Sequence, residues 1–197
     1  MDVFLLLYDG FTALDAFGPA EVLGSLDSWR IRCVSPAGGT VTSAQAIRVE
    51  TEPLPDASGG VLLLPGGPGT RALVDDAAFL GALARAAAQA EWLLCVCTGS
   101  ALAARAGLLD DKTATTNRRA FDWVAAQGPR TRWDRTARYT ADGRVYTSAG
   151  VSAGIDMALG FVCDRFGPET AREIAARKEY RPAPEGRICG IDRPRRT

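Results

Sequence analysis

Short, uninterrupted apolar runs recur along this chain, and each one is closed by turn-forming or small residues. The clearest runs lie at positions 3–8, 61–64 and 92–96. Runs of this length without polar alternation are typical of strands that are buried on both faces of a parallel sheet. Helix-like stretches separate them, and this alternation predicts a single α/β domain whose mostly parallel sheet carries helices on both faces.

The remaining elements follow from periodicity and turn signals. We expect further strands at 29–35 and 113–116, a short hairpin at 40–51, and a second hairpin in which 131–138 pairs with 144–148 across Asp142-Gly143. We expect helices at 19–26, 70–90, 101–106, 117–127, 152–166 and 168–180. The first of them is placed at Pro19, because proline fits the first turn of a helix. We assign residues 1–180 to one domain and 181–197 to a tail rich in proline and arginine.

Charge and hydropathy exclude several classes of protein. The 23 lysines and arginines balance 23 aspartates and glutamates, which argues against electrostatic binding to nucleic acid or to an anionic membrane. The arginines between 118 and 138 are therefore interpreted as a solvated face. The longest apolar run has six residues, too few to span a membrane. Because the sequence starts directly with a strand-like run, we expect a cytoplasmic protein without a signal peptide.

The chain contains no histidine, and this removes whole mechanisms. Cys-His and Ser-His pairs and histidine-ligated metal sites are excluded. The five cysteines are Cys33, Cys95, Cys97, Cys163 and Cys189. An odd number without a signal peptide indicates reduced thiols in the cytoplasm, and the C-x-C spacing at 95 and 97 fits no zinc pattern. We therefore expect no metal and no cofactor.

Cys97 stands where a buried strand turns tightly into a helix, which is the arrangement of a nucleophile elbow. Gly99 and Ser100 are small, so the backbone can bend there. The N-terminus of the following helix favours a thiolate, so we expect Cys97 to be the most readily alkylated cysteine. The alternative, a small buried apolar side chain, suits Cys95, which lies inside the strand.

Two further features reach the same edge of the sheet. The glycines of Pro65-Gly66-Gly67-Pro68-Gly69 let the backbone approach a ligand, and the Gly67 N–H could form an oxyanion-hole-like pocket with the Thr98 N–H. A plain turn is the alternative. Asp15 is an acid among apolar neighbours after the first strand, and its alternative role is a helix N-cap.

Together these segments resemble the ThiJ/PfpI superfamily, whose members are glutamine-amidotransferase-like α/β proteins. The resemblance is carried by residues 8–19, by Leu64-Pro65-Gly66-Gly67 and by Val96-Cys97-Thr98-Gly99-Ser100. Segments 106–109, 114–116 and 150–156 fit as well, so the match runs from about residue 3 to 180. Within the superfamily the chain is most similar to the isonitrile hydratase-like subgroup, and next to the front domain of AraC-type regulators.

The resemblance implies a flavodoxin-like single-domain sandwich, a homodimer and roles for particular residues. Cys97 matches the elbow cysteine, Asp15 matches the acid presented to it, and Thr98 matches the residue after the nucleophile. The residues that would bind substrate or an oxyanion are Gly66, Gly67, Gly150 and Val151. One departure is that relatives commonly read Ala-Thr-Thr-His where this chain ends the motif in Asn117.

Three hypotheses follow from these residues and from the resemblance. The first is a cysteine-dependent hydratase that converts an isonitrile to an N-substituted formamide, with Cys97 as nucleophile and protonated Asp15 as acid. The second is another small-molecule enzyme of the superfamily, glyoxalase-like or amidase-like. The third is a non-catalytic sensor or regulator, against which the lack of a helix-turn-helix pattern counts.

Overall fold

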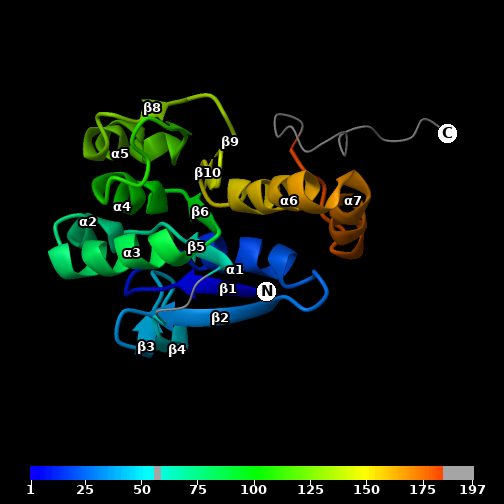
Figure 1. Ribbon diagram of the computed structural model, residues 1–197, viewed down its shortest axis with the longest axis horizontal. Helices are drawn as coiled ribbons and strands as arrows, with labels where there is room; N and C mark the ends of the chain where they lie inside the picture. Colours follow the sequence, from blue (N-terminus) through cyan, green and yellow to red (C-terminus); the bar gives the residue numbers. More distant parts are fainter. Residues whose placement is uncertain (56–58, 184–197) are drawn as a thin grey trace.

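An eight-stranded sheet runs through the middle of the protein, whose computed structural model describes residues 1–55 and 59–183 (Figure 1). The spatial order of the strands is β3-β4-β2-β1-β5-β6-β10-β9. These strands are β1 (Asp2–Leu6), β2 (Arg30–Ser35), β3 (Gly39–Thr42), β4 (Arg48–Pro53), β5 (Val61–Leu64), β6 (Trp92–Val96), β9 (Tyr139–Asp142) and β10 (Val145–Ser148). The strands from β4 to β10 are parallel, and only the two edges, β3 and β9, pair antiparallel.

Helices cover both faces of this sheet (Figure 1). The helices are α1 (Ala13–Leu23), α2 (Thr70–Leu73), α3 (Ala77–Gln89), α4 (Gly99–Arg105), α5 (Phe121–Gln127), α6 (Ala153–Phe166) and α7 (Pro168–Arg177), with a 3-10 turn η1 (Arg118–Ala120) before α5. Helices α1, α6 and α7 pack together, whereas α2 to α5 form a second group. The predicted single α/β domain with a mostly parallel sheet is confirmed.

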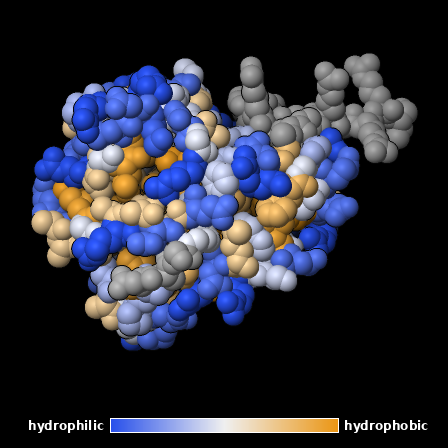
Figure 2. Space-filling model, viewed as in Figure 1, coloured by the Kyte–Doolittle hydropathy of each residue, from blue (hydrophilic) through white to orange (hydrophobic). Residues whose placement is uncertain are grey.

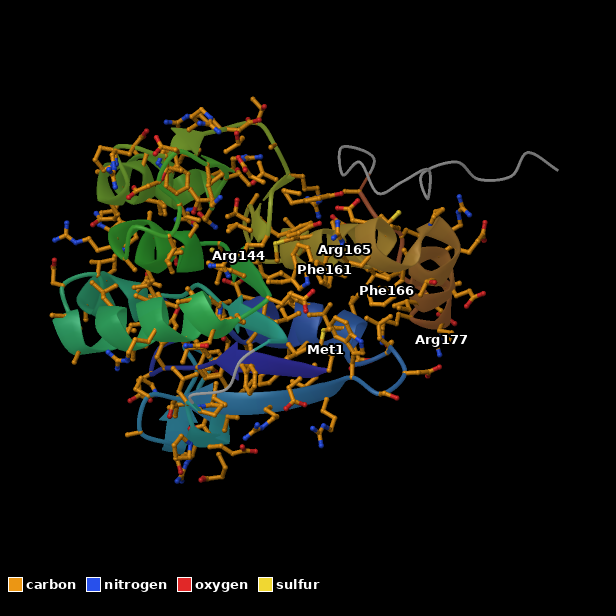
Figure 3. All side chains as sticks on the ribbon, in the orientation of Figure 1. Met1, Arg144, Phe161, Arg165, Phe166 and Arg177 are labelled. Atoms are coloured by element: carbon orange, nitrogen blue, oxygen red, sulfur yellow. The ribbon has the colours of Figure 1, made fainter. Side chains whose placement is uncertain are left out.

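The central strands are buried on both faces, as their apolar runs predict. All four residues of β5 are buried, and β1 and β6 are buried after their first residue. Phe161, labelled on α6 in Figure 3, belongs to an aromatic cluster. Its ring stands edge-on against those of Trp92 and Tyr146. Leu5 of β1 lies beside Leu63 of β5, so the carboxyl ends of these strands stop at the same edge.

The sheet changes direction between β1 and β5. From β1 the chain continues outward to β2, whereas from β5 it continues the opposite way to β6 and β10. In open α/β sheets a ligand binds at such a switch point, beyond the carboxyl ends of the strands. The loops after β1, β5, β6 and β10 all meet there, and the expected site residues belong to these loops or to the helices that follow them.

The first helix, α1, begins earlier than expected. It begins at Ala13 rather than Pro19, so Pro19 lies inside it. Proline costs one backbone hydrogen bond there, but tight packing against α6 compensates: a Cβ on Gly18 would come within 2.9 Å of Ile155, and one on Gly154 within 3.0 Å of Pro19. Tertiary packing therefore overrides the local preference of proline for a first turn.

Two other expectations need correction. The helix expected at 70–90 is broken into α2 and α3, because the Asp76 carboxylate accepts hydrogen bonds from Ala78 N and Phe79 N and so caps a new helix. The strand partner of β10 is β9 rather than residues 131–138; β8 (Arg132–Trp133) pairs instead with β7 (Thr113–Ala114). The turn at Asp142-Gly143 and the β3–β4 hairpin are as expected.

In the view of Figure 2, apolar patches interrupt a mainly polar surface, and the exposed apolar side chains include Leu14, Val151 and Phe166. Across residues 1–55 and 59–183, no helix has the length and apolar character needed to cross a membrane. Most of the expected tail, residues 184–197, lies outside the described part of the chain.

Candidate active site

Cys97 forms the turn between β6 and α4 in a backbone conformation that is uncommon for a residue with a side chain. Its φ is +56°, in the left-handed region. Its N–H donates to the Ser148 carbonyl at 3.1 Å, and its carbonyl accepts from the hydroxyls of Ser100 and Thr116, both at 2.8 Å. These contacts hold the strained turn from both sides, as functional sites commonly require.

The elbow and the loop after β5 approach each other too closely for side chains between them. A Cβ on Gly99 would lie 2.5 Å from the Leu64 carbonyl oxygen, and one on Gly66 would lie 2.6 Å from Thr98 N and 2.9 Å from Asp15 Oδ2. Glycine is therefore required at both positions. Gly66 is wedged between Thr98 and Asp15, and this brings the acid to the elbow.

Asp15 lies in the first turn of α1 with no solvent exposure. Its Oδ2 accepts a hydrogen bond from Gly66 N at 3.1 Å. Its Oδ1 is buried, and no residue of the described chain hydrogen-bonds to it. Asp15 and the Cys97 thiol are close enough that each shifts the pKa of the other. Asp15 does not act as the N-cap, a position that Thr12 occupies.

Burial raises both pKa values of this pair, and the negative charge of Asp15 raises that of Cys97 further. Burial raises the pKa of Asp15 to about 6, although the Cys97 thiol and the Gly66 N–H oppose the shift. Burial and the Asp15 charge raise the pKa of Cys97 to about 12, although the N–H groups of Thr98 and Val151 oppose this shift. Between these values the pair holds one proton, and the two groups titrate as a unit.

This finding corrects the expectation that the helix N-terminus leaves Cys97 as a thiolate. Cys97 is only 6% exposed, and desolvation together with a neighbouring carboxylate outweighs the backbone N–H groups. A raised pKa also removes the reason to expect that Cys97 is alkylated first. Cys33 is partly exposed, whereas Cys95 is fully buried, as expected of a structural residue.

The cysteines differ from expectation in one further respect. Cys33, Cys95 and Cys97 are free thiols, but Cys163 is disulfide-bonded, so the chain is not fully reduced. The odd number of cysteines in the sequence does not show which of them come together in space. Cys189 lies outside the described residues. In the described chain no three cysteine, aspartate or glutamate side chains gather closely enough to hold a metal ion.

The prediction that the N–H groups of Gly67 and Thr98 together form an oxyanion-hole-like pocket is wrong for Gly67. The Gly67 N–H donates to the Thr98 hydroxyl at 2.9 Å, so it is not available to a ligand. Thr98 thereby ties the glycine loop to the elbow, and its own N–H faces the Cys97 sulfur. The second N–H at the sulfur comes from Val151, whose φ of +36° is also in the left-handed region.

Gly150 and Asn117 meet on the other side of the elbow. A Cβ on Gly150 would lie 2.6 Å from Asn117 Nδ2, so the two segments touch only because residue 150 is glycine. The Asn117 side chain caps η1 by accepting from the N–H groups of Arg119 and Ala120. Asn117 is thus a structural cap where the sequence pattern led us to look for a histidine.

Comparison with known proteins identifies the family of this chain. Residues 1–163 match the DJ-1/PfpI family. The chain belongs to the DJ-1/PfpI family. This confirms the resemblance that the elbow, glycine-loop and Asp15 segments indicated.

Individual relatives of this DJ-1/PfpI protein are similar over nearly its whole length. It is 34% identical over 190 residues to the isonitrile hydratase of Pseudomonas putida, covering 93% of this chain and 80% of that protein. A crystal structure of a ThiJ/PfpI family protein from Pseudomonas syringae matches with a TM-score of 0.82 at 31% identity, covering 93% of this chain and 76% of that one. An AraC family transcriptional regulator from Pseudomonas putida shares the fold, with a TM-score of 0.73 at 20% identity over 90% of this chain and 98% of that one.

Sequence reasoning missed the residues that fix the elbow from outside its own segment. Thr116 and Ser148 hold the carbonyl and the N–H of Cys97, but they lie 19 and 51 residues further along the chain. The segment 114–116 was part of the family pattern, yet nothing in it indicates a hydrogen bond to the elbow. Such contacts depend on the strand order, which brings β10 beside β6.

The paired pKa values give a first prediction. We expect Asp15→Asn to lower the pKa of Cys97, because the substitution removes a negative charge and supplies an amide that can donate to a thiolate. The measurement is thiolate absorbance in the ultraviolet as a function of pH, with the curve of Cys97→Ala subtracted to remove the other thiols. An unchanged or raised Cys97 pKa would mean that the two side chains do not interact.

Proposed function

We propose that this protein is an isonitrile hydratase, a cysteine-dependent enzyme that adds water to an isonitrile and releases an N-substituted formamide. The observation that carries the proposal is the buried Asp15–Cys97 pair, which holds one proton in a chain without histidine. The 34% sequence identity between this chain and an isonitrile hydratase supports the same activity. The reaction needs one nucleophile and one proton donor, and this pair supplies both.

In the first half of the reaction, Cys97 and the shared proton add to the same atom. The Asp15 carboxylate accepts the thiol proton as the sulfur forms a bond to the isonitrile carbon. The carbon lone pair then takes this proton from Asp15, and one pair of the carbon–nitrogen triple bond moves to nitrogen. The product is a thioimidate on Cys97, and Asp15 is left ionised. General acid assistance of this kind typically contributes about 10²–10⁴-fold in rate.

In the second half, water releases the formamide. The water oxygen attacks the thioimidate carbon, the nitrogen takes one proton of the water, and Asp15 takes the other. The carbon–sulfur bond then breaks as the carbonyl forms, so that Cys97 leaves as thiolate. The pair again holds one proton, and neither a metal nor a cofactor is consumed.

The surrounding backbone has a supporting role in this proposal. The N–H groups of Thr98 and Val151, which face the sulfur, stabilise the thiolate as it is expelled. Gly66 positions Asp15, and Gly67 holds the Thr98 side chain. Gly150 lets the segment that carries Val151 approach the elbow. Asn117 caps η1 at the position where relatives commonly have histidine, and the chain contains no histidine elsewhere. Amidase-like chemistry that needs a cysteine–histidine pair is therefore disfavoured.

The activity is tested by formamide production from a panel of aliphatic and aromatic isonitriles. We expect Cys97→Ala to abolish it, and Asp15→Asn to reduce it by about 10²-fold or more, because the amide cannot release a proton to carbon. Cys95→Ala is the matched control, since Cys95 is a buried cysteine two residues before Cys97, inside β6. Asp15→Asn should melt at a temperature close to the parent. Near-full activity of this variant would remove the acid role.

The pH dependence follows from the same pair. Below a pH of about 6 Asp15 and Cys97 each hold a proton, so Asp15 cannot accept the proton of the thiol as the sulfur attacks. As the pH rises through about 6 one proton leaves, and we expect kcat/KM to increase and then stay level. Rates of Cys97→Ala, measured in parallel, correct for uncatalysed acid hydrolysis. A profile that falls through this range would indicate that the doubly protonated pair is the active form.

We also propose that the protein is a homodimer, paired near the elbow. From the sequence alone, the apolar stretch 17–26 is the candidate surface for this pairing, but it is largely buried and packs against α6. The contact is therefore assigned to the exposed side chains of Leu14 and Val151. We expect a dimeric mass by light scattering at micromolar concentration and a monomeric mass for Leu14→Glu. Phe166→Glu is the control, because Phe166 is equally exposed but lies at the far end of α6. A monomeric parent protein would refute the proposal.

A further inference from the structure

A hollow of about 350 Å³ lies beside the elbow. It is lined by Asn117, Arg118, Arg119, Thr136, Arg138, Ala149 and Gly150. Two of its walls are continuous with the site: Gly150 precedes Val151, whose N–H faces the Cys97 sulfur, and Asn117 follows Thr116, whose hydroxyl holds the Cys97 carbonyl. A molecule in this hollow therefore contacts the two segments that hold the sulfur and the carbonyl of Cys97.

The three arginines of the hollow differ in how their charge is balanced. Arg138 forms an ion pair with the buried carboxylate of Asp156, which also accepts a hydrogen bond from Tyr180. The Arg118 guanidinium is held by neutral acceptors, the carbonyls of Thr136 and Ala137 at 2.7 Å and the Thr115 hydroxyl, and its charge is felt by Asp134.

Arg119 is the arginine with a free charge. Its backbone N–H binds Asn117, but its guanidinium is exposed and enters no ion pair with any residue of the described chain. No carboxylate lines the hollow: Asp156 is paired with Arg138, and Asp134 is the carboxylate that feels the charge of Arg118. The hollow therefore carries an excess of positive charge, which favours an anion with the planar geometry that guanidinium binds.

We infer that the substrate is an isonitrile that carries a carboxylate, and that Arg119 and the adjoining Arg118 bind this carboxylate while the isocyano carbon meets Cys97. The inference rests on the proposed hydratase activity and names its substrate class. Arg119 forms no ion pair and Arg118 has only neutral acceptors, so the two guanidinium groups suit the single negative charge of a carboxylate. The volume of the hollow is near the lower end of ligand sites, about 300–1,000 Å³, and suits a molecule of amino-acid size.

The first arm of the test compares isocyano carboxylates of increasing chain length with their methyl esters. We expect the parent protein to hydrate the best acid at least about tenfold more efficiently, in kcat/KM, than its ester, the size of one charge-assisted hydrogen bond. Because the contact is exposed to solvent, this preference should shrink as salt is raised.

The second arm measures the acid-to-ester preference in variants. Arg119→Ala should reduce this ratio about tenfold through KM for the acid, and Arg119→Lys should restore part of it because the charge returns. Arg85→Ala, which removes an exposed arginine on α3 away from the hollow, should leave the ratio unchanged. Melting temperatures of the variants establish that each is folded.

The outcomes separate the inference from the activity on which it rests. Hydration of esters and acids with equal efficiency, or a ratio unaffected by Arg119→Ala, would overturn the inference and leave the hydratase activity intact. Hydration of no isonitrile at all would overturn both. A preference that follows Arg119 and falls with salt supports a carboxylate subsite.

Discussion

The carboxyl ends of β5 and β6 approach each other so closely that side chains are excluded between them, and the rest of the site depends on this contact. Gly99 leaves room for the Leu64 carbonyl, and Gly66 leaves room for both Thr98 and Asp15. Any larger residue would push the glycine loop away from the elbow. The acid would then lose its hydrogen bond from Gly66 N, and the Thr98 hydroxyl would lose the Gly67 N–H. The same steric constraint therefore sets the position of Asp15 and the electrostatics of the Asp15–Cys97 pair.

The same contact excludes water and sets the protonation of the pair. Two acidic groups that are buried side by side cannot both be ionised at low cost, so one proton is retained over a wide range of pH. The backbone N–H groups at the sulfur reduce the cost of a thiolate without removing it. The site therefore keeps one proton beside the sulfur. Asp15 is the group through which this proton can pass to the substrate atom that the sulfur attacks.

The sequence was sufficient for those parts of the molecule that depend on local pattern. Apolar runs located β1, β5 and β6, and the strand-to-helix turn at Cys97 identified the elbow. The errors concern effects that arise only in three dimensions: Pro19 inside a helix that packs against α6, the Gly67 N–H taken by Thr98, and the raised pKa of Cys97. Asp76 is different, since its capping pattern was present in the sequence and was overlooked.

A raised thiol pKa need not make Cys97 a poor nucleophile for an isonitrile. An alkylating agent takes only the sulfur, so it leaves the proton of the pair behind and reacts slowly with a buried thiol. An isonitrile carbon accepts sulfur and proton together, so the pair never has to lose its proton to solvent. The pair is thereby selective for acceptors of this kind. The absence of histidine fits the same logic, since a further base near the sulfur would compete with the substrate for the one proton that the pair holds.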